Sequence, residues 1–258
     1  MTERVRVAPE CLEVPDGAEV PLGEETEHHL RVLRVDAGES LVLFDGDGFE
    51  RDAVIHAVSK REMVVVARGS RREGARYDSA RVTWLQGYTK GDKLDLIVRQ
   101  ATELGVAVIR PVYTARSVPR EREDKGSARL VRWQRIAEEA ARQSGRADVP
   151  LVLPPAPLDD ALAALGDEPS LRVVAWERSD QSLLDVVSRA PEGPSIVLAG
   201  PEGGLDDDEV ARCVRCGFAH ATLGPRVLRA ETVAPALLAI LSALRGDLRN
   251  VPPHARHR

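Results

Sequence analysis

The strongest constraint on the fold of this chain is an alternation of strand-like and helix-like segments that begins near residue 81. The strand-like runs lie at 81–88, 106–113, 171–177, 195–200 and 218–224. The helical segments, marked by apolar residues at intervals of three and four, lie at 92–105, 127–146 and 231–246. Strands separated by helices of this length predict an α/β fold, a mostly parallel sheet with helices on both faces.

The N-terminal part of the chain follows a different pattern. Its strand-like runs lie at 41–46, 49–58 and 62–69, after a helical segment at 24–35. Short strands joined by tight turns predict a small β-barrel. The expected order is therefore a barrel at 1–72, a polar linker at 73–81, a second domain at 82–250 and a disordered tail at 251–258.

The last helical segment, 231–246, is apolar nearly all round. Such a helix must be buried on several sides, either in the core or against a second subunit. Pro235 fits it only if the proline lies in the first turn, where no backbone N–H is needed for a helical hydrogen bond.

Charge is distributed unevenly along the 258 residues, whose net charge is −5. Residues 1–72 hold 10 Lys and Arg against 15 Asp and Glu, whereas residues 110–146 hold 10 against 5. A local basic segment suits selective contact with nucleic acid, although a solvated helix face would look the same. Aromatic residues make up only 3%, so such contact would depend on arginine and backbone groups more than on base stacking.

Several classes of protein are disfavoured by what the sequence lacks. No run approaches the roughly 20 apolar residues of a membrane span, and the start lacks the apolar core of a secretory signal, so we expect a cytoplasmic protein. Cys213 and Cys216, with His220, form at most a partial metal site, because a structural zinc needs four ligands. We expect no metal, and ordinary helix packing for these cysteines.

A glycine-rich turn, AGPEGGL at 199–205, is followed at once by an acidic run. Asp206 with Glu209 three residues later is typical of a capped helix start. These carboxylates offset the positive end of the helix that would otherwise attract a phosphate. A neutral or cationic ligand held by backbone groups, such as S-adenosylmethionine, fits better, although two plain turns with a well-capped helix remain possible.

A second unusual loop, LGPRVLRAET at 223–232, follows the next strand-like run. In an open parallel sheet, ligands bind beyond the carboxyl ends of the strands. Neither loop contains the G-x-G-x-x-G pattern of dinucleotide sites or the G-K-[ST] of nucleotide phosphate loops.

The two loops and the apolar last helix resemble the SPOUT methyltransferases, and more narrowly the bacterial family that methylates N3 of a uridine in 16S ribosomal RNA. The resemblance covers nearly the whole chain. Its further blocks, in order, are HHLRVLRV…GESLVLFDGDG (28–48), KGDKLDLIVRQATELGV (90–106), ARSV (115–118) and EEAARQSGR (138–146). The chain departs from the family pattern at Arg99-Gln100, where Gln-Lys is usual, at Ala230, where Thr is frequent, and at Val233-Ala234-Pro235.

The resemblance implies a trefoil knot in the sheet, a PUA-like N-terminal barrel that binds RNA, and a homodimer. It implies S-adenosylmethionine as cofactor and 16S rRNA of the small ribosomal subunit as partner. The implied cofactor-binding residues come from three strand ends. They are Trp176, Leu198, Gly200, Pro201, Glu202, Gly203, Gly204, Leu223, Gly224, Val227 and Leu228. Taken alone, each of the leucines is read more simply as core packing.

Methyl transfer to uridine N3 requires loss of the N3 proton, which spreads negative charge onto the neighbouring carbonyl oxygens. Arg229 and Arg226 are the candidates to stabilise that charge. Glu231 or Glu202 would accept the proton, provided that burial raises its basicity. Glu231 could instead serve only the helix start, and Arg226 could only pair with it.

Basic residues of both parts of the chain are the candidate RNA phosphate contacts. They are Arg31, Arg34, Arg116, Arg120, Arg142 and Arg146. The alternatives for the whole chain are another SPOUT-class RNA methyltransferase, acting on tRNA or on a ribose 2′ oxygen, and a non-catalytic RNA-binding assembly factor.

Overall fold

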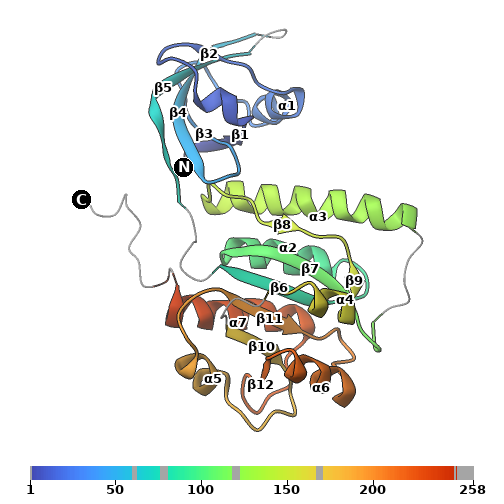
Figure 1. The fold of residues 1–258 in the computed structure, drawn as a ribbon. Helices are drawn as coiled ribbons and strands as arrows, with labels where there is room; N and C mark the ends of the chain where they lie inside the picture. The colour runs from blue at the N-terminus through green and yellow to red at the C-terminus, as the bar shows by residue number, and fades with distance from the viewer. Residues whose placement is uncertain are drawn as a thin grey trace. The chain divides into compact units, whose positions relative to one another are not determined.

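The computed structural model describes residues 2–59, 63–75, 81–117, 123–166, 171–246 and 248. The chain forms two compact units (Figure 1). The N-terminal unit comprises residues 1–76 and 138–149, and the C-terminal unit comprises residues 77–137 and 150–258. The expected tail and most of the expected linker lie outside the described residues.

The N-terminal unit contains a five-stranded sheet in the order β1-β3-β4-β5-β2. Its elements are β1 (Glu3–Arg6), the 3-10 helix η1 (Pro9–Leu12), β2 (Glu19–Val20), α1 (Glu24–Val32), β3 (Ser40–Phe44), β4 (Phe49–Val58) and β5 (Met63–Glu73). β1 pairs with β3 in parallel, and the other pairings are antiparallel. Leu30 of α1 is buried against the inward residues of the strands, including Leu41, Leu43 and Ile55. One apolar side of α1 and alternate strand residues therefore build this core.

Residues 138–149 complete the N-terminal unit, although they are distant from it in sequence. The backbone N–H of Gly48 donates to the carbonyl of Ala147 at 3.0 Å, and that of Ala147 donates to Ala75 at 3.1 Å. The Val149 N–H donates to Gly46 at 2.8 Å. These paired backbone groups join the segment to the turn between β3 and β4 and to the chain after β5.

The C-terminal unit is built on a sheet in the order β12-β10-β11-β6-β7-β8, with β9 paired to β7. All of these pairings are parallel, so the expected α/β fold with a mostly parallel sheet is confirmed. The strands are β6 (Val82–Gly87), β7 (Val106–Tyr113), β8 (Leu151–Val152), β9 (Ala156–Pro157), β10 (Leu171–Ala175), β11 (Ser195–Ala199) and β12 (Ala219–Ala221). The helices are α2 (Lys93–Glu103), α3 (Glu123–Ser144), α4 (Leu158–Ala163), α5 (Leu183–Arg189), α6 (Asp207–Arg215) and α7 (Ala230–Arg245).

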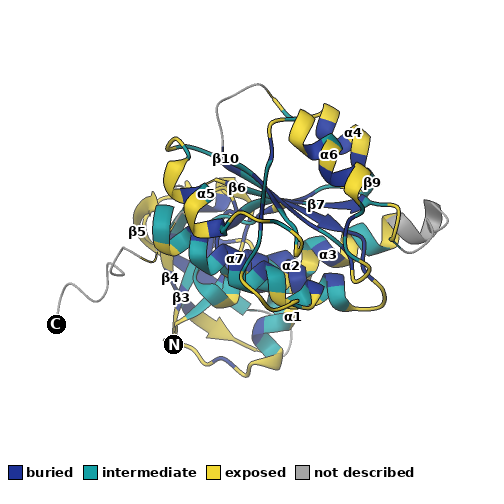
Figure 2. Cartoon of the chain, turned by 90° about the horizontal axis from the view of Figure 1, so that it is seen from below, coloured by how far each residue is buried: buried dark blue, intermediate teal, exposed yellow. Residues whose placement is uncertain are grey.

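Helices cover both faces of this sheet, with α2 and α7 on one side and α4 and α6 on the other (Figure 2). Leu85, Val174 and Leu198 face the α4 and α6 side, where they form one apolar cluster with residues of these helices. The strands are buried on both faces, which accounts for their nearly continuous apolar sequence.

The start of α7 differs from the expectation. Arg229 is the N-cap residue, with extended backbone, and Ala230 is the first helical residue. Pro235 therefore lies inside the helix, beyond the first turn, where it removes the hydrogen bond that the Glu231 carbonyl would accept. The buried side chains of Ala234, Leu237, Leu238 and Leu241 offset this loss. Most of the remaining α7 residues are partly buried (Figure 2).

Candidate cofactor and catalytic site

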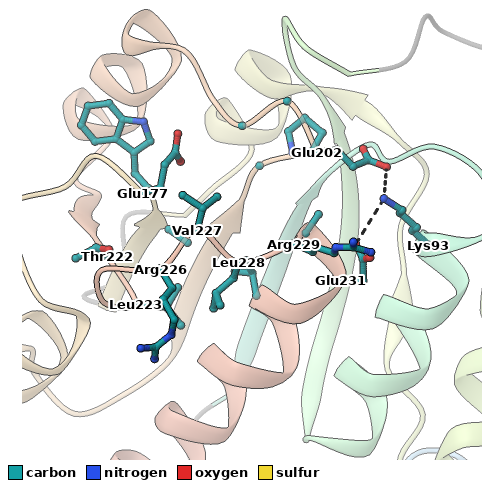
Figure 3. A pocket seen from close by; sticks show the side chains of 18 residues that line it. Lys93, Glu177, Glu202, Thr222, Leu223, Arg226, Val227, Leu228, Arg229 and Glu231 are labelled. Carbon is teal, nitrogen blue, oxygen red and sulfur yellow. Dashed lines mark ion pairs between the residues drawn. The ribbon is translucent and has the colours of Figure 1, made fainter.

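A pocket of about 370 Å³ lies at the carboxyl ends of β10, β11 and β12, next to the start of α7 (Figure 3). It is lined by Lys93, Ala175, Trp176, Glu177, Gly200, Pro201, Glu202, Gly203, Gly204, Thr222, Leu223, Arg226, Val227, Leu228, Arg229, Ala230, Glu231 and Val233. The two loops singled out in the sequence thus form walls of one pocket, at the edge where parallel sheets bind ligands.

The glycine loop after β11, residues 200–204, is held by the end of β6. The buried Gln86 amide donates to the Gly200 carbonyl at 3.1 Å, and its oxygen accepts from the Trp84 indole N–H at 3.0 Å. A Cβ on Gly87 would lie 2.4 Å from Pro201, so only glycine permits this approach. Gly204 has φ +71°, in the left-handed region that glycine favours.

The acidic run that follows the glycine loop caps α6, as expected. The Asp206 carboxylate accepts the Glu209 N–H at 2.8 Å, and Glu209 Oε2 accepts the Asp206 N–H at 3.0 Å, a complete capping box. Glu209 is buried, and its Oε1 also accepts the Ala115 N–H at 2.7 Å. These two carboxylates therefore serve the helix start and its junction with the loop after β7.

Most of the cofactor-binding residues implied by the resemblance line the pocket. Leu198 and Gly224 are the exceptions. Leu198 is fully buried beneath α4 and α6, so core packing is its role in this structure. Gly224, at φ +105°, shapes the turn after β12, where its carbonyl accepts the Thr222 hydroxyl at 3.0 Å.

Val227 is an exposed apolar residue of the pocket lining, of which 82% remains accessible. The indole of Trp176 forms part of the wall, packed edge-on against His220 at a centroid distance of 5.8 Å. Apolar wall groups of this kind suit an aromatic ring such as adenine.

Lys93 is a pocket residue that the sequence analysis did not single out. Its ammonium lies 3.1 Å from Oε1 of Glu202 and 3.6 Å from Oε2 of Glu231 (Figure 3). The signal was available, because Lys93 lies in the 90–106 block that carries the family resemblance. A lysine between two glutamates places one positive and two negative charges on this side of the pocket.

Glu202 does not meet the condition set for a proton acceptor. Burial acts to raise its pKa, but hydrogen bonds from its own backbone N–H, from Lys93 and from the Lys90 N–H outweigh burial, and the pKa is lowered. The basicity of Glu202 is therefore reduced. The Oε2 atom of Glu231 is buried and makes no hydrogen bond within the described residues.

Arg226 and Arg229 are both exposed residues of the pocket lining. In Figure 3 the Arg226 side chain points away from Lys93. Within the described residues, the carboxylate of Glu231 is paired with Lys93 and not with Arg226, so the purely structural role that the sequence left open for Arg226 is not seen there.

The candidate RNA-contacting arginines fall into different environments. Arg34 is exposed, and Arg31 is paired with Glu27 and with the carbonyl of Ser59. Arg116 donates to the Gly203 carbonyl at 2.8 Å and so supports the back of the glycine loop. Arg120 lies outside the described residues.

Two of these arginines belong to the segment that completes the N-terminal unit. Arg142 is paired with Glu3 and Glu139. Arg146 is fully buried and forms a salt bridge with Asp148 at 2.6 Å. The expectation that Arg146 contacts RNA is therefore corrected, because a buried guanidinium cannot reach a phosphate.

The structure gives the cysteines no ligand-binding arrangement. Among the described residues, no three His, Cys, Asp or Glu side chains are grouped so that they could hold a metal ion. Burial raises the pKa of the Cys213 thiol to about 12. Within the same residues, no helix combines the length and apolar character needed to cross a membrane.

Comparisons with known proteins agree with this geometry. Residues 76–242 match a family model described as an RNA methyltransferase domain, and residues 22–67 match an RNA methyltransferase PUA domain. Over 235 residues the chain is 35% identical to the ribosomal RNA small subunit methyltransferase E of Bacillus subtilis, covering 87% of this chain and 91% of the relative.

Two solved structures cover nearly all of the chain. The ribosomal RNA small subunit methyltransferase E of Neisseria gonorrhoeae, bound to S-adenosyl methionine, has a TM-score of 0.86 at 30% identity and covers 96% of this chain and 99% of its own. A Legionella pneumophila protein, solved in complex with the bound cofactor SAM, has a TM-score of 0.85 at 30% identity and the same coverage. The resemblance found in the sequence is thereby confirmed, and the chain belongs to the RNA methyltransferase family that includes the ribosomal RNA small subunit methyltransferase E proteins.

Proposed function

We propose that the protein uses S-adenosylmethionine to methylate N3 of a specific uridine in 16S rRNA of the small ribosomal subunit. The observation that carries this proposal is the pocket formed jointly by the 200–204 and 222–231 loops in a chain with these relatives. The proposal includes a cytoplasmic location and the domain limits 1–72 and 82–250, except that residues 138–149 belong to the N-terminal unit.

The residues of the pocket fit an adenosyl sulfonium compound. Beside the glycine loop, Leu223, Val227 and Leu228 offer apolar contact for the adenine ring. Glu177, Glu202 and Glu231 are balanced by three basic residues of the same lining, Lys93, Arg226 and Arg229, so the pocket has no excess of positive charge that would select a phosphate. When bound, the cofactor would supply a methyl group activated by the sulfonium charge.

The chain's own residues would prepare uridine for the transfer. Glu231 would accept the N3 proton, and the Arg229 guanidinium would stabilise the charge that develops on a uracil carbonyl oxygen. Arg226 is the second candidate for that oxygen. Since Glu202 has a lowered pKa, we assign it to the cofactor loop and not to proton transfer. Holding the base in line with the methyl group would provide much of the remaining acceleration.

RNA phosphates would be contacted by the exposed residues Arg34, in the N-terminal unit, and Arg116, near the glycine loop, and by Arg31, which is partly buried. Uridine N3 lies on the pairing edge, so the base must be unpaired or turned out before it reacts.

Finer features of the fold and assembly belong to the same proposal. We propose that the C-terminal segment is threaded into a trefoil knot, that the N-terminal sheet closes into a barrel, and that two copies form a homodimer. The knot is supported by the resemblance to the SPOUT methyltransferases and by the RNA methyltransferase family to which the chain belongs. The dimer is supported by the apolar surface of α7, which is only partly buried within one chain.

The test uses small subunits from a strain that lacks the enzyme. They are incubated with the protein and S-adenosylmethionine, and the nucleosides of the rRNA are measured by mass spectrometry. We expect 3-methyluridine at one site. A different methylated nucleoside would favour another SPOUT-class activity, and RNA binding without donor binding in calorimetry would favour an assembly factor.

A further inference from the structure

Lys93 stands at a position that its own helix disfavours. It is the first residue of α2, and the N-terminus of a helix carries partial positive charge that favours an anion over a cation. Asp95 meets that preference within the same turn. The position of Lys93 is therefore better explained by the groups that it contacts across the pocket.

The Lys93 ammonium joins two different walls of the pocket. Glu202, at 3.1 Å, belongs to the loop after β11, and Glu231, at 3.6 Å, belongs to the first turn of α7 (Figure 3). α2 also packs directly against α7, so the lysine and Glu231 come from helices that fix each other's position. One charge thus connects the cofactor loop with the proposed proton acceptor.

The two carboxylates depend on Lys93 to different degrees. Glu202 Oε1 also accepts the Lys90 backbone N–H at 3.1 Å, so this carboxylate keeps a partner if the lysine is removed. Glu231 Oε2 is buried and has no hydrogen bond within the described residues, where it forms an ion pair with Lys93. Removing the ammonium would leave that oxygen without compensation for its burial.

We propose that Lys93 is a positioning residue for methyl transfer, which holds the Glu231 carboxylate in the orientation that receives the uridine N3 proton. This inference rests on the function proposed above. During transfer the N3–H bond breaks and a Glu231 O–H bond forms, while the nitrogen electron pair forms the bond to the methyl carbon. The carbon–sulfur electron pair leaves with sulfur. Lys93 keeps its protons throughout, and Glu231 later releases its proton to water.

The test compares Lys93→Met, which removes the charge at similar length, with Lys93→Arg, which keeps it. Transfer of tritiated methyl groups to small subunits gives kcat and KM, calorimetry gives donor affinity, and thermal unfolding monitors the fold. We expect Lys93→Met to lower kcat about 10- to 100-fold, at the lower end of what general-base catalysis contributes, with donor affinity changed less than about threefold. Lys93→Arg should recover most of the rate. Lys93→Gln replaces Lys93→Met if the methionine variant unfolds.

A double-mutant cycle separates positioning from a general structural effect. In a Glu231→Gln background, Lys93→Met should cost less than about twofold, because the group that it positions is already gone. In a Glu202→Gln background, used as the matched control, Lys93→Met should lower kcat by the same factor as it does in the wild-type protein. The same cost in both backgrounds, or equal losses of rate and donor affinity, would overturn the inference.

Failure of the proposed function gives a different result. Tritium counts every methyl group regardless of its position, so the Lys93 cycle can be measured whichever nucleotide is methylated. If mass spectrometry shows that the wild-type protein methylates another nucleotide, the uridine assignment is overturned and the rates of the cycle can still be compared. A wild-type protein that transfers no methyl group to RNA overturns both.

Discussion

Two arginines of the N-terminal unit and two of the C-terminal unit differ in burial and in role, although nothing in the sequence distinguishes them. In the N-terminal unit, Arg51 and Arg146 are buried. Arg51 donates to the carbonyls of Leu12 at 3.0 Å and of Gly69 at 2.5 Å, and Arg146 is paired with Asp148. In the C-terminal unit, Arg226 and Arg229 are exposed in the lining of the pocket. The first pair satisfies the polar groups of a fold, whereas the second is accessible to a ligand.

The difference teaches that the environment decides what an arginine does. A buried guanidinium must have its hydrogen bonds met, because an unpaired charge away from water costs several kcal/mol, about 3–5 when one partner of a buried pair is removed. An exposed guanidinium is hydrated and needs no partner within the protein. It is therefore available to bind a phosphate or to stabilise a developing negative charge. Substitutions should therefore separate the two groups, with stability lost in one and activity in the other.

The largest effect is expected for Arg146→Met. This change removes a buried, hydrogen-bonded guanidinium and leaves the partly exposed Asp148 without its partner, so it should lower the free energy of unfolding by about 3 kcal/mol, measured by urea denaturation with an unchanged m-value. RNA affinity of the remaining folded protein should stay the same. A loss of stability below about 1 kcal/mol would break the comparison, because Arg146 would then behave like a surface residue.

Arg229→Ala should show the opposite behaviour. Removing a guanidinium that stabilises developing charge should lower turnover about 100-fold, with donor affinity changed less than about threefold. The free energy of unfolding should change by no more than about 0.5 kcal/mol. Steady-state kinetics and calorimetry check this, with Arg226→Ala as the matched variant. Equal losses of turnover and donor affinity would mean that Arg229 binds the cofactor instead.

Arg34→Ala should give a smaller effect, on RNA binding alone. Arg34 is exposed, so loss of one phosphate contact should weaken affinity several-fold and reduce the slope of log affinity against log salt by about 1. Arg31→Ala is the control, and it should lose less because Arg31 is already held by Glu27 and the Ser59 carbonyl. Titrations at several salt concentrations measure both. An unchanged slope would remove Arg34 from the RNA surface.

The smallest effect is expected for Arg142→Ala. Its ion pairs with Glu3 and Glu139 are partly exposed, so the free energy of unfolding should fall by about 1 kcal/mol or less. RNA affinity should not change, since the guanidinium is already engaged by carboxylates. Should this variant lose as much RNA affinity as Arg34→Ala, the pairing with Glu3 and Glu139 would have to open on binding.

The sequence predicted the elements whose patterns repeat over enough residues. The alternation of strand-like and helix-like segments from residue 81 onward predicted the parallel sheet and helices such as α2 and α7, because the spacing of apolar residues reflects their burial directly. Asp206 and Glu209 predicted the start of α6, because a capping box is a local arrangement. β8 and β9 are too short to show a period, and their positions depend on pairing with β7.

Parts of the site depended on tertiary contacts that no local pattern records. In the sequence, Lys93 is indistinguishable from a solvated charge at the start of a helix. Its role becomes evident only from the fold, which places Glu202 and Glu231 beside it. Arg146 lies in a segment with more basic than acidic residues, 110–146, and nothing in the sequence distinguishes it from Arg142, so its burial could not be predicted. Leu198 was assigned to the cofactor by its place in a motif, whereas its side chain faces the core.

The segment at 138–149 has a consequence for how the protein is made. It belongs to the N-terminal unit, yet a ribosome synthesises it long after residue 76. Domains usually fold in order of synthesis, as each one emerges. Here the first unit cannot be completed until α3 has left the exit tunnel, so Gly46, Gly48 and Ala75 lack their backbone partners meanwhile. A nascent chain stalled shortly after residue 76 should accordingly remain sensitive to protease. Protease resistance of the N-terminal unit should appear only in chains long enough for Val149 to have emerged from the ribosome.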